Sequence, residues 1–343
     1  MPVVGLHLGN HSFKAAELER SKDGPVLKKY GIYRNPKVSF SSSDNSDIKD
    51  YSSALDAFFS EVGFSTRDVV VSLPEHEVFV RTIKVPNMSE KELGSSIQFE
   101  AEQYVPLPIK EVTLSYQLLG PDNFEKDKME VLLVAAKKEI VTRHVDVLKK
   151  AHLVPRGLEP ETLAISRVLG SSAQNPNATV IVSVNTENTL IVVAYKGFVR
   201  LTRSVAAGGD ALTRAIQQGL SLDYMQAEEY KKTYGLDQTK VDGKVFAALK
   251  PVFDSIISEV NRSKVFFSSR NAHVIINKVV VSGGTALMPG LLLYMVNNLD
   301  VEVELANPWR SVNFSPKLES EQEKILGLGP LFVTPVGLAL KEV

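Results

Sequence analysis

The sequence contains no cysteine, which excludes disulfides, thiolate metal sites and cysteine nucleophiles together. It also has little excess charge, because 39 basic and 40 acidic residues leave a formal net charge of −1. No broad positive field is therefore available for nucleic acid or an anionic membrane. Long apolar runs are lacking as well. The most apolar late stretch, residues 326–340, is shorter than the ~18 residues needed to span a bilayer and contains two prolines.

What is present is the composition of a globular protein with a sizeable core. The 343 residues are 44% hydrophobic and 23% charged, enough for two domains of ordinary size. The first ten residues lack the basic segment and long apolar core of a signal peptide. We expect a cytoplasmic protein without direct membrane insertion, which reaches the inner face of the membrane through partners.

One pattern occurs twice along the chain. Residues 3–18 and 26–34 predict a strand, a polar turn with a glycine, and further strands, and residues 178–205 predict the same order. An amphipathic helix follows the first set and ends at Gly63, whereas the helix after the second set is expected to be capped by Asp210. Two α/β lobes facing a cleft would result.

A separate small unit is predicted at residues 79–154. Its order is strand, helix, strand, strand, helix, and the first helix begins with a capping box formed by Ser89 and Glu92. Such a β-α-β-β-α segment reads as an α+β module inserted into the first lobe.

Three turns carry the composition of phosphate-binding or nucleotide-binding loops. They are the segments GNHS at 9–12 with Lys14 behind it, NTENT at 185–189, and SGGTALMPG at 282–290. Each on its own also fits an ordinary turn. The six histidines show no metal-binding spacing, so we expect no metal held by histidines and place His144 and His152 on a helix surface.

The joint order of these turns is that of the actin-like ATPase fold. The chain moreover resembles the PilM family, the cytosolic actin-like proteins of type IV pilus assembly, over essentially its full length. The resemblance is carried by the stretches at 4–18, 80–119, 203–232, 279–291 and 337–341. The inserted module is similar to one in the cell-division protein FtsA, whose membrane-binding tail is missing here. The cytoplasmic part of the secretion protein GspL is also similar and stays an alternative.

The resemblance implies an α/β, actin-like (ribonuclease H-like) two-lobed fold with an inserted α+β subdomain of the FtsA 1C type. The first lobe would comprise residues 1–78, 155–177 and 330–343, with the inserted subdomain at 79–154. The second lobe would comprise 178–208 and 276–329, with a helical subdomain at 209–275.

The resemblance also implies residues that bind ATP or ADP. The first phosphate turn would consist of Gly9, Asn10, His11 and Ser12, with Lys14 close behind. The second would consist of Asn185, Thr186, Asn188 and Thr189. The remaining nucleotide contacts would come from Gly208, Gly209, Glu228, Lys231, Gly283, Gly284 and Thr285, with Glu228 and Lys231 near the ribose and base.

Two departures from the family pattern bear on chemistry. The family usually has an acidic residue where His7 stands and Asp-Ile-Gly where Ser183, Val184 and Asn185 stand, and these carboxylates hold hydrated Mg²⁺. We therefore expect no catalytic residues and a pseudo-ATPase, with a partly protonated His7 contacting a phosphate. Three alternatives remain: nucleotide bound without hydrolysis, with Mg²⁺ if it binds; an active Mg²⁺-dependent ATPase; and a scaffold without nucleotide.

The resemblance finally implies a partner. PilM-family proteins bind the short cytoplasmic N-terminal segment of the membrane protein PilN in a groove beside the inserted module, and other proteins of the pilus assembly platform are expected partners too. Tyr104 and Val105, in IQFEAEQYVPLP, are the candidate contact residues, and core packing is the alternative role for each.

Overall fold

The computed structural model describes residues 2–9, 12–34, 45–121, 127–170, 172 and 174–341. The chain forms two compact units. One combines Met1–Ala164, Trp309–Lys324 and Thr334–Val343, and the other combines Ile165–Pro308 and Ile325–Val333. Each unit is thus assembled from segments that lie far apart in the sequence, and each is described below by itself.

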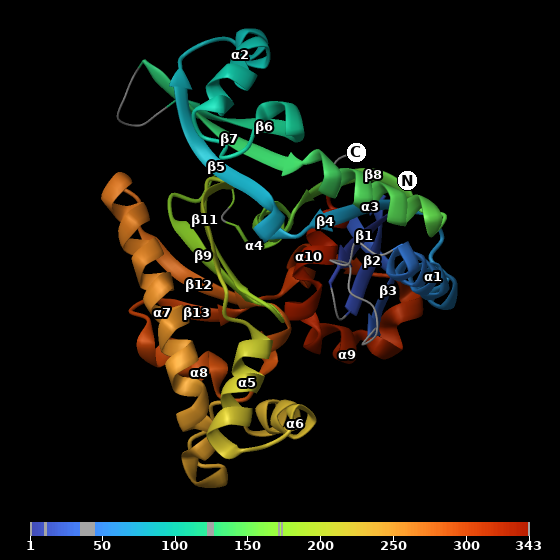
Figure 1. Cartoon of the computed structure of the whole chain (residues 1–343), viewed down its shortest axis with the longest axis vertical. Helices are drawn as coiled ribbons and strands as arrows, with labels where there is room; N and C mark the ends of the chain where they lie inside the picture. The colour runs from blue at the N-terminus through green and yellow to red at the C-terminus, as the bar shows by residue number, and fades with distance from the viewer. Residues whose placement is uncertain are drawn as a thin grey trace. The chain divides into compact units, whose positions relative to one another are not determined.

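The first unit contains a six-stranded sheet with the order β14-β3-β2-β1-β4-β8 (Figure 1). Its strands are β1 (Val3–Leu8), β2 (Ser12–Ser21), β3 (Gly24–Arg34), β4 (Asp68–Leu73), β8 (Val154–Pro160) and β14 (Asn313–Phe314). The first three form an antiparallel meander, whereas β4 runs parallel to β1 and β8 runs parallel to β4. Helix α1 (Asn45–Val62) packs on this sheet through Leu55 and Phe58, and Gly63 ends it as predicted.

Helix α3 (Lys138–Lys150) contributes to two hydrophobic clusters of the first unit. Val147 and Leu148 pack in the core of the six-stranded sheet, and Ile140 packs beside Val78. His144 lies between them and is fully buried, so its prediction as a surface residue is wrong. Its Nδ1 lies 2.8 Å from the carbonyl oxygen of Ile140, and burial lowers the pKa of His144 to about 4. The ring is therefore neutral at pH 7 and serves the packing.

A three-stranded sheet forms separately within the first unit. It has the order β5-β7-β6, with β5 (Val78–Pro86), β6 (Val112–Pro121) and β7 (Lys128–Lys137) all antiparallel. Helix α2 (Glu90–Glu102) covers one face, burying Leu93, Ile97 and Ala101 against it. The capping box of Ser89 and Glu92 is present at the start of α2, and the predicted β-α-β-β-α order is confirmed.

The second unit contains a five-stranded sheet with the order β11-β10-β9-β12-β13. Its strands are β9 (Ala178–Val184), β10 (Thr189–Tyr195), β11 (Phe198–Val205), β12 (Ile276–Ser282) and β13 (Glu302–Leu305). β9 to β11 form an antiparallel meander, and β12 runs parallel to β9. This order repeats that of β3-β2-β1-β4-β8, which confirms the duplicated pattern of the sequence. Every residue of β9 and β10 is buried.

Among the described residues, four helices belong wholly to the second unit: α5 (Gly209–Leu220), α6 (Tyr224–Tyr234), α7 (Lys244–Arg270) and α8 (Leu291–Asn298). The N-cap of α5 is Gly208, so the prediction that Asp210 caps this helix is wrong, and Asp210 lies inside the first turn. The carboxylate of Asp210 accepts a hydrogen bond of 2.9 Å from the hydroxyl of Tyr224. Three helices contain a boundary between the units, α4 (Glu161–Leu169), α9 (Gln322–Gly327) and α10 (Gly329–Ala339).

The remaining elements are short 3-10 helices, at Glu75–Glu77, Ile109–Glu111, Val241–Gly243, Gly284–Leu287, Pro308–Ser311 and Pro316–Glu321. The late apolar stretch of the sequence forms α10, which has 11 residues. Across the described ranges, no helix has both the length and the apolar character that crossing a bilayer requires.

Candidate functional site

One candidate site belongs to the first unit and lies where β1 and β4 end, side by side and parallel. Ligands of α/β proteins commonly bind at the carboxyl ends of such strands. His7 in β1 pairs across the hairpin with Lys14 in β2, and its Nδ1 lies 3.2 Å from Oγ of Ser72 in β4. Burial, together with the charge of Lys14, lowers the pKa of His7 to about 3. The expectation of a partly protonated His7 is therefore wrong, because the ring is neutral at pH 7.

The turn after β1 is closed by its own backbone. The amide of Gly9 donates to the carbonyl oxygen of Ser12 at 3.0 Å, and Nζ of Lys14 donates to Oγ of Ser12 at 3.1 Å. The other two predicted members of this turn, Asn10 and His11, lie outside the described residues. Lys14 thus contacts the turn through Ser12, and burial lowers the pKa of Lys14.

Two carboxyl groups near the ends of these strands were missed by sequence reasoning: Glu75 is buried and Glu161 is half-buried. Glu75 accepts hydrogen bonds from the hydroxyl of Thr162 at 3.0 Å and from its amide at 3.4 Å. Burial and the negative charge of Glu161 raise the pKa of Glu75 to about 8. The sequence did contain a signal for these two residues. Glu75 follows β4 and Glu161 follows β8, so both lie at the carboxyl ends of parallel strands, where ligands commonly bind.

A second candidate site belongs to the second unit and lies where the turn after β9 meets the start of α5. The amides of Gly209 and Asp210 donate to the carbonyl oxygens of Asn185 and Thr186, both at 2.8 Å. These amides at the helix start are therefore already paired within the protein. A Cβ atom at Gly208 would lie 2.6 Å from the carbonyl oxygen of Asn185, so this glycine is required for the close packing of turn and helix.

The remaining polar residues of this turn have partners inside the unit. Ser183 donates to Oδ1 of Asn185 at 3.1 Å, and the backbone amide of Asn185 donates to the carbonyl oxygen of Asn188 at 2.9 Å. The hydroxyl of Thr189 is buried and donates to the carbonyl oxygen of Ala207 at 2.6 Å. Thr186 and Glu187, at the tip of the turn, are exposed, and Asn185 and Asn188 are half-buried.

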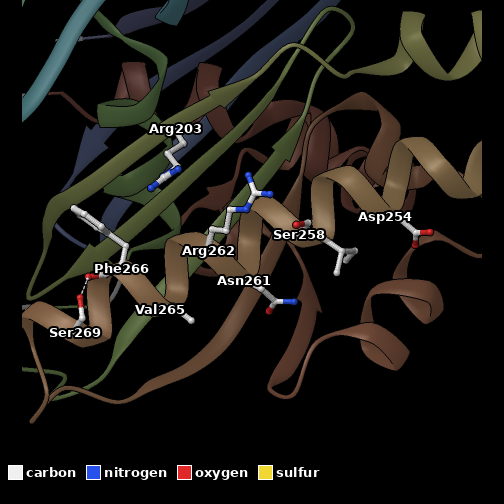
Figure 2. A pocket seen from close by; sticks show the side chains of 9 residues that line it. Arg203, Asp254, Ser258, Asn261, Arg262, Val265, Phe266 and Ser269 are labelled. Atoms are coloured by element: carbon white, nitrogen blue, oxygen red, sulfur yellow. Dashed lines mark hydrogen bonds between the residues drawn. The ribbon is translucent and has the colours of Figure 1, made fainter.

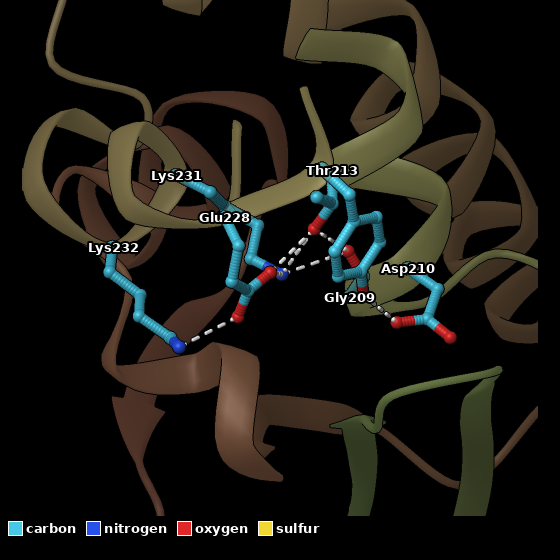
Figure 3. Close-up of polar contacts among 7 residues, drawn as sticks. Gly209, Asp210, Thr213, Glu228, Lys231 and Lys232 are labelled. Atoms are coloured by element: carbon cyan, nitrogen blue, oxygen red, sulfur yellow. Dashed lines mark hydrogen bonds and ion pairs between the residues drawn. The ribbon is translucent and has the colours of Figure 1, made fainter. Parts of the chain in front are cut away.

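Helices α5 and α6 are joined by a buried polar cluster (Figure 3). Nζ of Lys231 donates to the carbonyl oxygen of Gly209 at 2.9 Å and to Oγ1 of Thr213 at 2.8 Å, and it forms an ion pair of 2.5 Å with Glu228. Burial alone would raise the pKa of Glu228, but hydrogen bonds from Lys231, Thr213 and Lys232 hold it at about 2. Glu228 and Lys231 therefore contact each other and are tied to the start of α5.

The Gly-Gly turn follows β12 and contains two glycines with different roles. Gly283 has φ +88° and is buried, and a Cβ there would lie 2.4 Å from the carbonyl oxygen of Val184. Gly284 is exposed, and a Cβ there would meet nothing within 4 Å. Thr285 lies next to Gly209, since its Oγ1 would be 3.2 Å from a Cβ at that glycine. The structure thus brings all the predicted residues of the second unit to one place.

The described residues do not fit a magnesium ion held by the protein. Neither His7 nor Ser183 carries a carboxylate, and no three His, Asp or Glu side chains within the described ranges gather closely enough to hold a metal ion. Hard cations such as Mg²⁺ prefer carboxylate and other oxygen ligands. No chemical step through a metal follows from these side chains.

The two candidate partner residues differ in accessibility. Val105 is buried in the core of the three-stranded sheet and is not available to a partner, so its role is packing. Tyr104 is half-buried, with the guanidinium of Arg81 5.7 Å from its ring centroid. Phe99, in the same sequence stretch and on α2, is 73% exposed and was not singled out from the sequence.

Comparison with solved structures shows the fold. A chain of a PilM-PilN type IV pilus biogenesis complex is similar, with 28% sequence identity, a TM-score of 0.83, and 98% of this chain and 97% of that chain covered. The ethanolamine utilization protein EutJ from Carboxydothermus hydrogenoformans is similar at 17% identity and a TM-score of 0.58, covering 99% of this chain and 89% of that chain. MreB 5 of Spiroplasma citri, bound to AMPPNP, is similar at 14% identity and a TM-score of 0.52, covering 98% and 94%.

These neighbours have the actin-like fold, and the last two show the fold alone. The family model described as type IV pilus assembly protein PilM matches residues 5–343, nearly the whole chain. The duplicated sheets, the inserted three-stranded module and the Gly-Gly turn all lie inside this match. The chain therefore belongs to the PilM family of type IV pilus assembly proteins.

Proposed function

We propose that the chain is a cytoplasmic structural component of a type IV pilus assembly platform, and that it binds the cytoplasmic N-terminal peptide of a PilN-like membrane protein. The observation that carries this proposal is the match to the PilM family over residues 5–343, together with the similarity to a chain of a PilM-PilN complex. Binding to such a peptide would bring the chain to the inner face of the membrane, where other platform proteins are further partners.

The inserted module offers a surface suited to this peptide. Phe99 on α2 exposes 73% of its area, an unusual amount for a large apolar side chain. Tyr104 lies in the same sequence stretch and is half-buried beside Arg81. An apolar side chain and an aromatic ring backed by a cation would hold the apolar residues of an extended peptide.

The test is a titration of the protein with a labelled synthetic peptide covering the cytoplasmic N-terminal segment of the PilN-like protein from the same organism. Phe99→Ser should weaken binding about 10-fold, equivalent to about 1.4 kcal/mol. Leu293→Ser is the matched control, since Leu293 on α8 is 65% exposed but lies in the other unit. Equal affinity of both variants would reject the surface, and no binding by the unmodified protein would reject the partner.

We further propose that ATP or ADP binds without hydrolysis. Support comes from the accessible polar groups of the second unit, at Thr186, Thr285 and the open position beside Gly284, and from the absence of a carboxylate at His7 and Ser183. Calorimetric titration with each nucleotide, with and without Mg²⁺, should show saturable binding and no phosphate release. Mg²⁺-dependent phosphate release would establish an active ATPase instead, and no heat of binding would establish a scaffold without nucleotide.

A further inference from the structure

A buried acid lies at the candidate site of the first unit. Glu75 follows β4 and is 7% exposed, and the hydroxyl of Thr162 lies 3.0 Å from each of its carboxyl oxygens. The amide of Thr162, in the first turn of α4, adds a longer hydrogen bond of 3.4 Å. Among the described residues, Thr162 is the one polar partner of Glu75. A buried carboxylate that faces no cation is costly, so these surroundings favour the neutral acid.

A second carboxyl group makes the ionisation of Glu75 more costly still. Glu161 precedes Thr162, begins α4 and is half-buried. Burial, and then the negative charge of Glu161, raise the pKa of Glu75 to about 8. About three quarters of Glu75 is therefore neutral at pH 7.5, and about a tenth is neutral at pH 9.0.

The other ionisable groups near the ends of β4 and β8 have surroundings of their own. His76 and Glu77 lie on the same short helix as the buried acid, with His76 exposed and Glu77 half-buried. Glu159, near the end of β8, is buried and forms an ion pair of 3.0 Å with Lys341. Glu161 is thus the charged group that acts on the buried acid.

Glu161 also acts on the cation of this site. Lys14 donates to Ser12 in the turn after β1, and burial lowers the pKa of Lys14. The charge of Glu161 raises that pKa and so supports the charged lysine, whereas Arg34 at the end of β3 lowers it. His7, which pairs with Lys14 across the hairpin, is neutral at pH 7. One carboxylate therefore links the cation of the site to the buried acid.

This arrangement makes the ionisation of Glu75 sensitive to a bound anion. The phosphates of the proposed nucleotide would lie beside Ser12 and Lys14, where they add negative charge near Glu161. Negative charge nearby disfavours the ionised form of a carboxyl group. Binding and protonation then favour each other, because the coupling of two binding events is reciprocal.

We propose that nucleotide binding at the site of the first unit is coupled to the uptake of one proton by Glu75, so that the phosphates are held while this acid is neutral. The coupling rests on the proposed nucleotide binding and adds its regulation by pH. The affinity is highest where Glu75 keeps its proton and falls as the pH rises through about 8. If the phosphates bind the neutral form alone, the affinity for ADP falls about 8-fold between pH 7.5 and pH 9.0.

The test is calorimetric titration of the full chain with ADP, without Mg²⁺, in two buffers that differ in their enthalpy of ionisation. The difference between the two heats counts the protons, and we expect an uptake of about 0.8 proton per ADP at pH 8.5. Glu75→Gln carries an amide that is neutral at every pH. This variant should take up no proton and should keep its affinity between pH 7.5 and pH 9.0.

The matched control is Asp254→Asn, another change of a carboxyl group to an amide. Asp254 lies in the second unit and lines a groove along α7 (Figure 2). Hydrogen bonds from Lys250 and Tyr294 lower the pKa of Asp254, so it is ionised throughout this pH range and its loss should leave the proton uptake unchanged. Glu161→Gln is a second test variant with Glu75 intact. Loss of its charge should lower the pKa of Glu75 and move the fall in affinity to lower pH.

The opposing results separate the coupling from nucleotide binding itself. ADP binding without proton uptake, or with the same uptake in Glu75→Gln, would overturn the coupling and leave nucleotide binding intact. An affinity that falls equally with pH in Glu75→Gln would assign the pH dependence to Lys14 and overturn the coupling as well. No binding of ADP to the unmodified protein at pH 7.5 would reject both. Circular dichroism checks that each variant is folded, and Glu161→Gln alone decides the matter if Glu75→Gln is not.

Discussion

The buried cluster of Lys231 provides the sharpest test of the second unit, because two neighbouring lysines of α6 bind the same carboxylate. Lys231 is 9% exposed and makes three contacts, to Gly209, Thr213 and Glu228, whereas Lys232 is 60% exposed and contacts Glu228 alone, at 2.9 Å. Replacing each lysine by methionine removes one charge and keeps most of the side-chain volume. The two variants therefore differ mainly in burial.

The expected magnitudes differ accordingly. Removing one partner of a buried ion pair costs ~3–5 kcal/mol, and an exposed pair contributes ~0–1 kcal/mol. Glu228 is 23% exposed and keeps its bonds from Thr213 and Lys232, so the lower end applies. We expect Lys231→Met to lower the free energy of unfolding by about 3 kcal/mol, and the melting temperature by roughly 6–12 °C. Lys232→Met should lower the free energy of unfolding by less than about 1 kcal/mol.

Urea and thermal unfolding followed by circular dichroism at pH 7 measure both values. A further check uses acid. The pKa of Glu228 is held at about 2, below its ordinary 4.5, so its contribution to stability is present above pH 4.5 and is lost as the pH falls toward 2. The difference in the free energy of unfolding between Lys231→Met and the unmodified protein should therefore decrease as the pH falls from 4.5 toward 2. Equal stability of the two methionine variants at pH 7 would refute the reasoning.

Two other predictions concern Glu75 in the first unit and Gly283 in the second unit. Burial and the charge of Glu161 raise the pKa of Glu75 from 4.5 to about 8, so the contribution of Glu75 to stability is full below pH 4.5 and is lost as the pH rises toward 8. The melting temperature of Glu75→Gln should therefore be close to that of the unmodified protein at pH 5 and higher than it at pH 8.5. An equal difference in melting temperature at both pH values would contradict this. Gly283→Ala should lower the free energy of unfolding by about 2 kcal/mol or more, because the added Cβ would meet the backbone of Val184. Gly284→Ala should change the free energy of unfolding by under about 0.5 kcal/mol, because its Cβ would meet nothing within 4 Å. Equal urea midpoints for the two variants would argue against the described turn.

Local and repeated features could be predicted from the sequence. The capping box of Ser89 and Glu92, the end of α1 at Gly63 and the order of the inserted module each depend on a few neighbouring residues. The duplicated meander was visible because the same strand and turn pattern recurs. The family resemblance then supplied the actin-like fold, which no periodicity alone would have specified.

Features that depend on distant contacts could not be predicted. His144 sits on a helix that looks amphipathic, but α3 packs through two hydrophobic clusters and buries the ring. Glu75 and Glu161 are distant in sequence and meet only when β4 and β8 pair. Gly208 and Gly283 resemble ligand-binding glycines, yet their missing side chains make room for the backbone of the turn after β9. Sequence composition does not distinguish these two uses of glycine.

The most direct test of the central claim is flotation of the purified chain with liposomes that contain a reconstituted PilN-like protein. Matched liposomes should contain the same protein without its cytoplasmic N-terminal segment, and a third set should contain lipid alone. The account predicts that the chain floats with the first liposomes only. Flotation with bare lipid, or failure to float with the complete PilN-like protein, would contradict it.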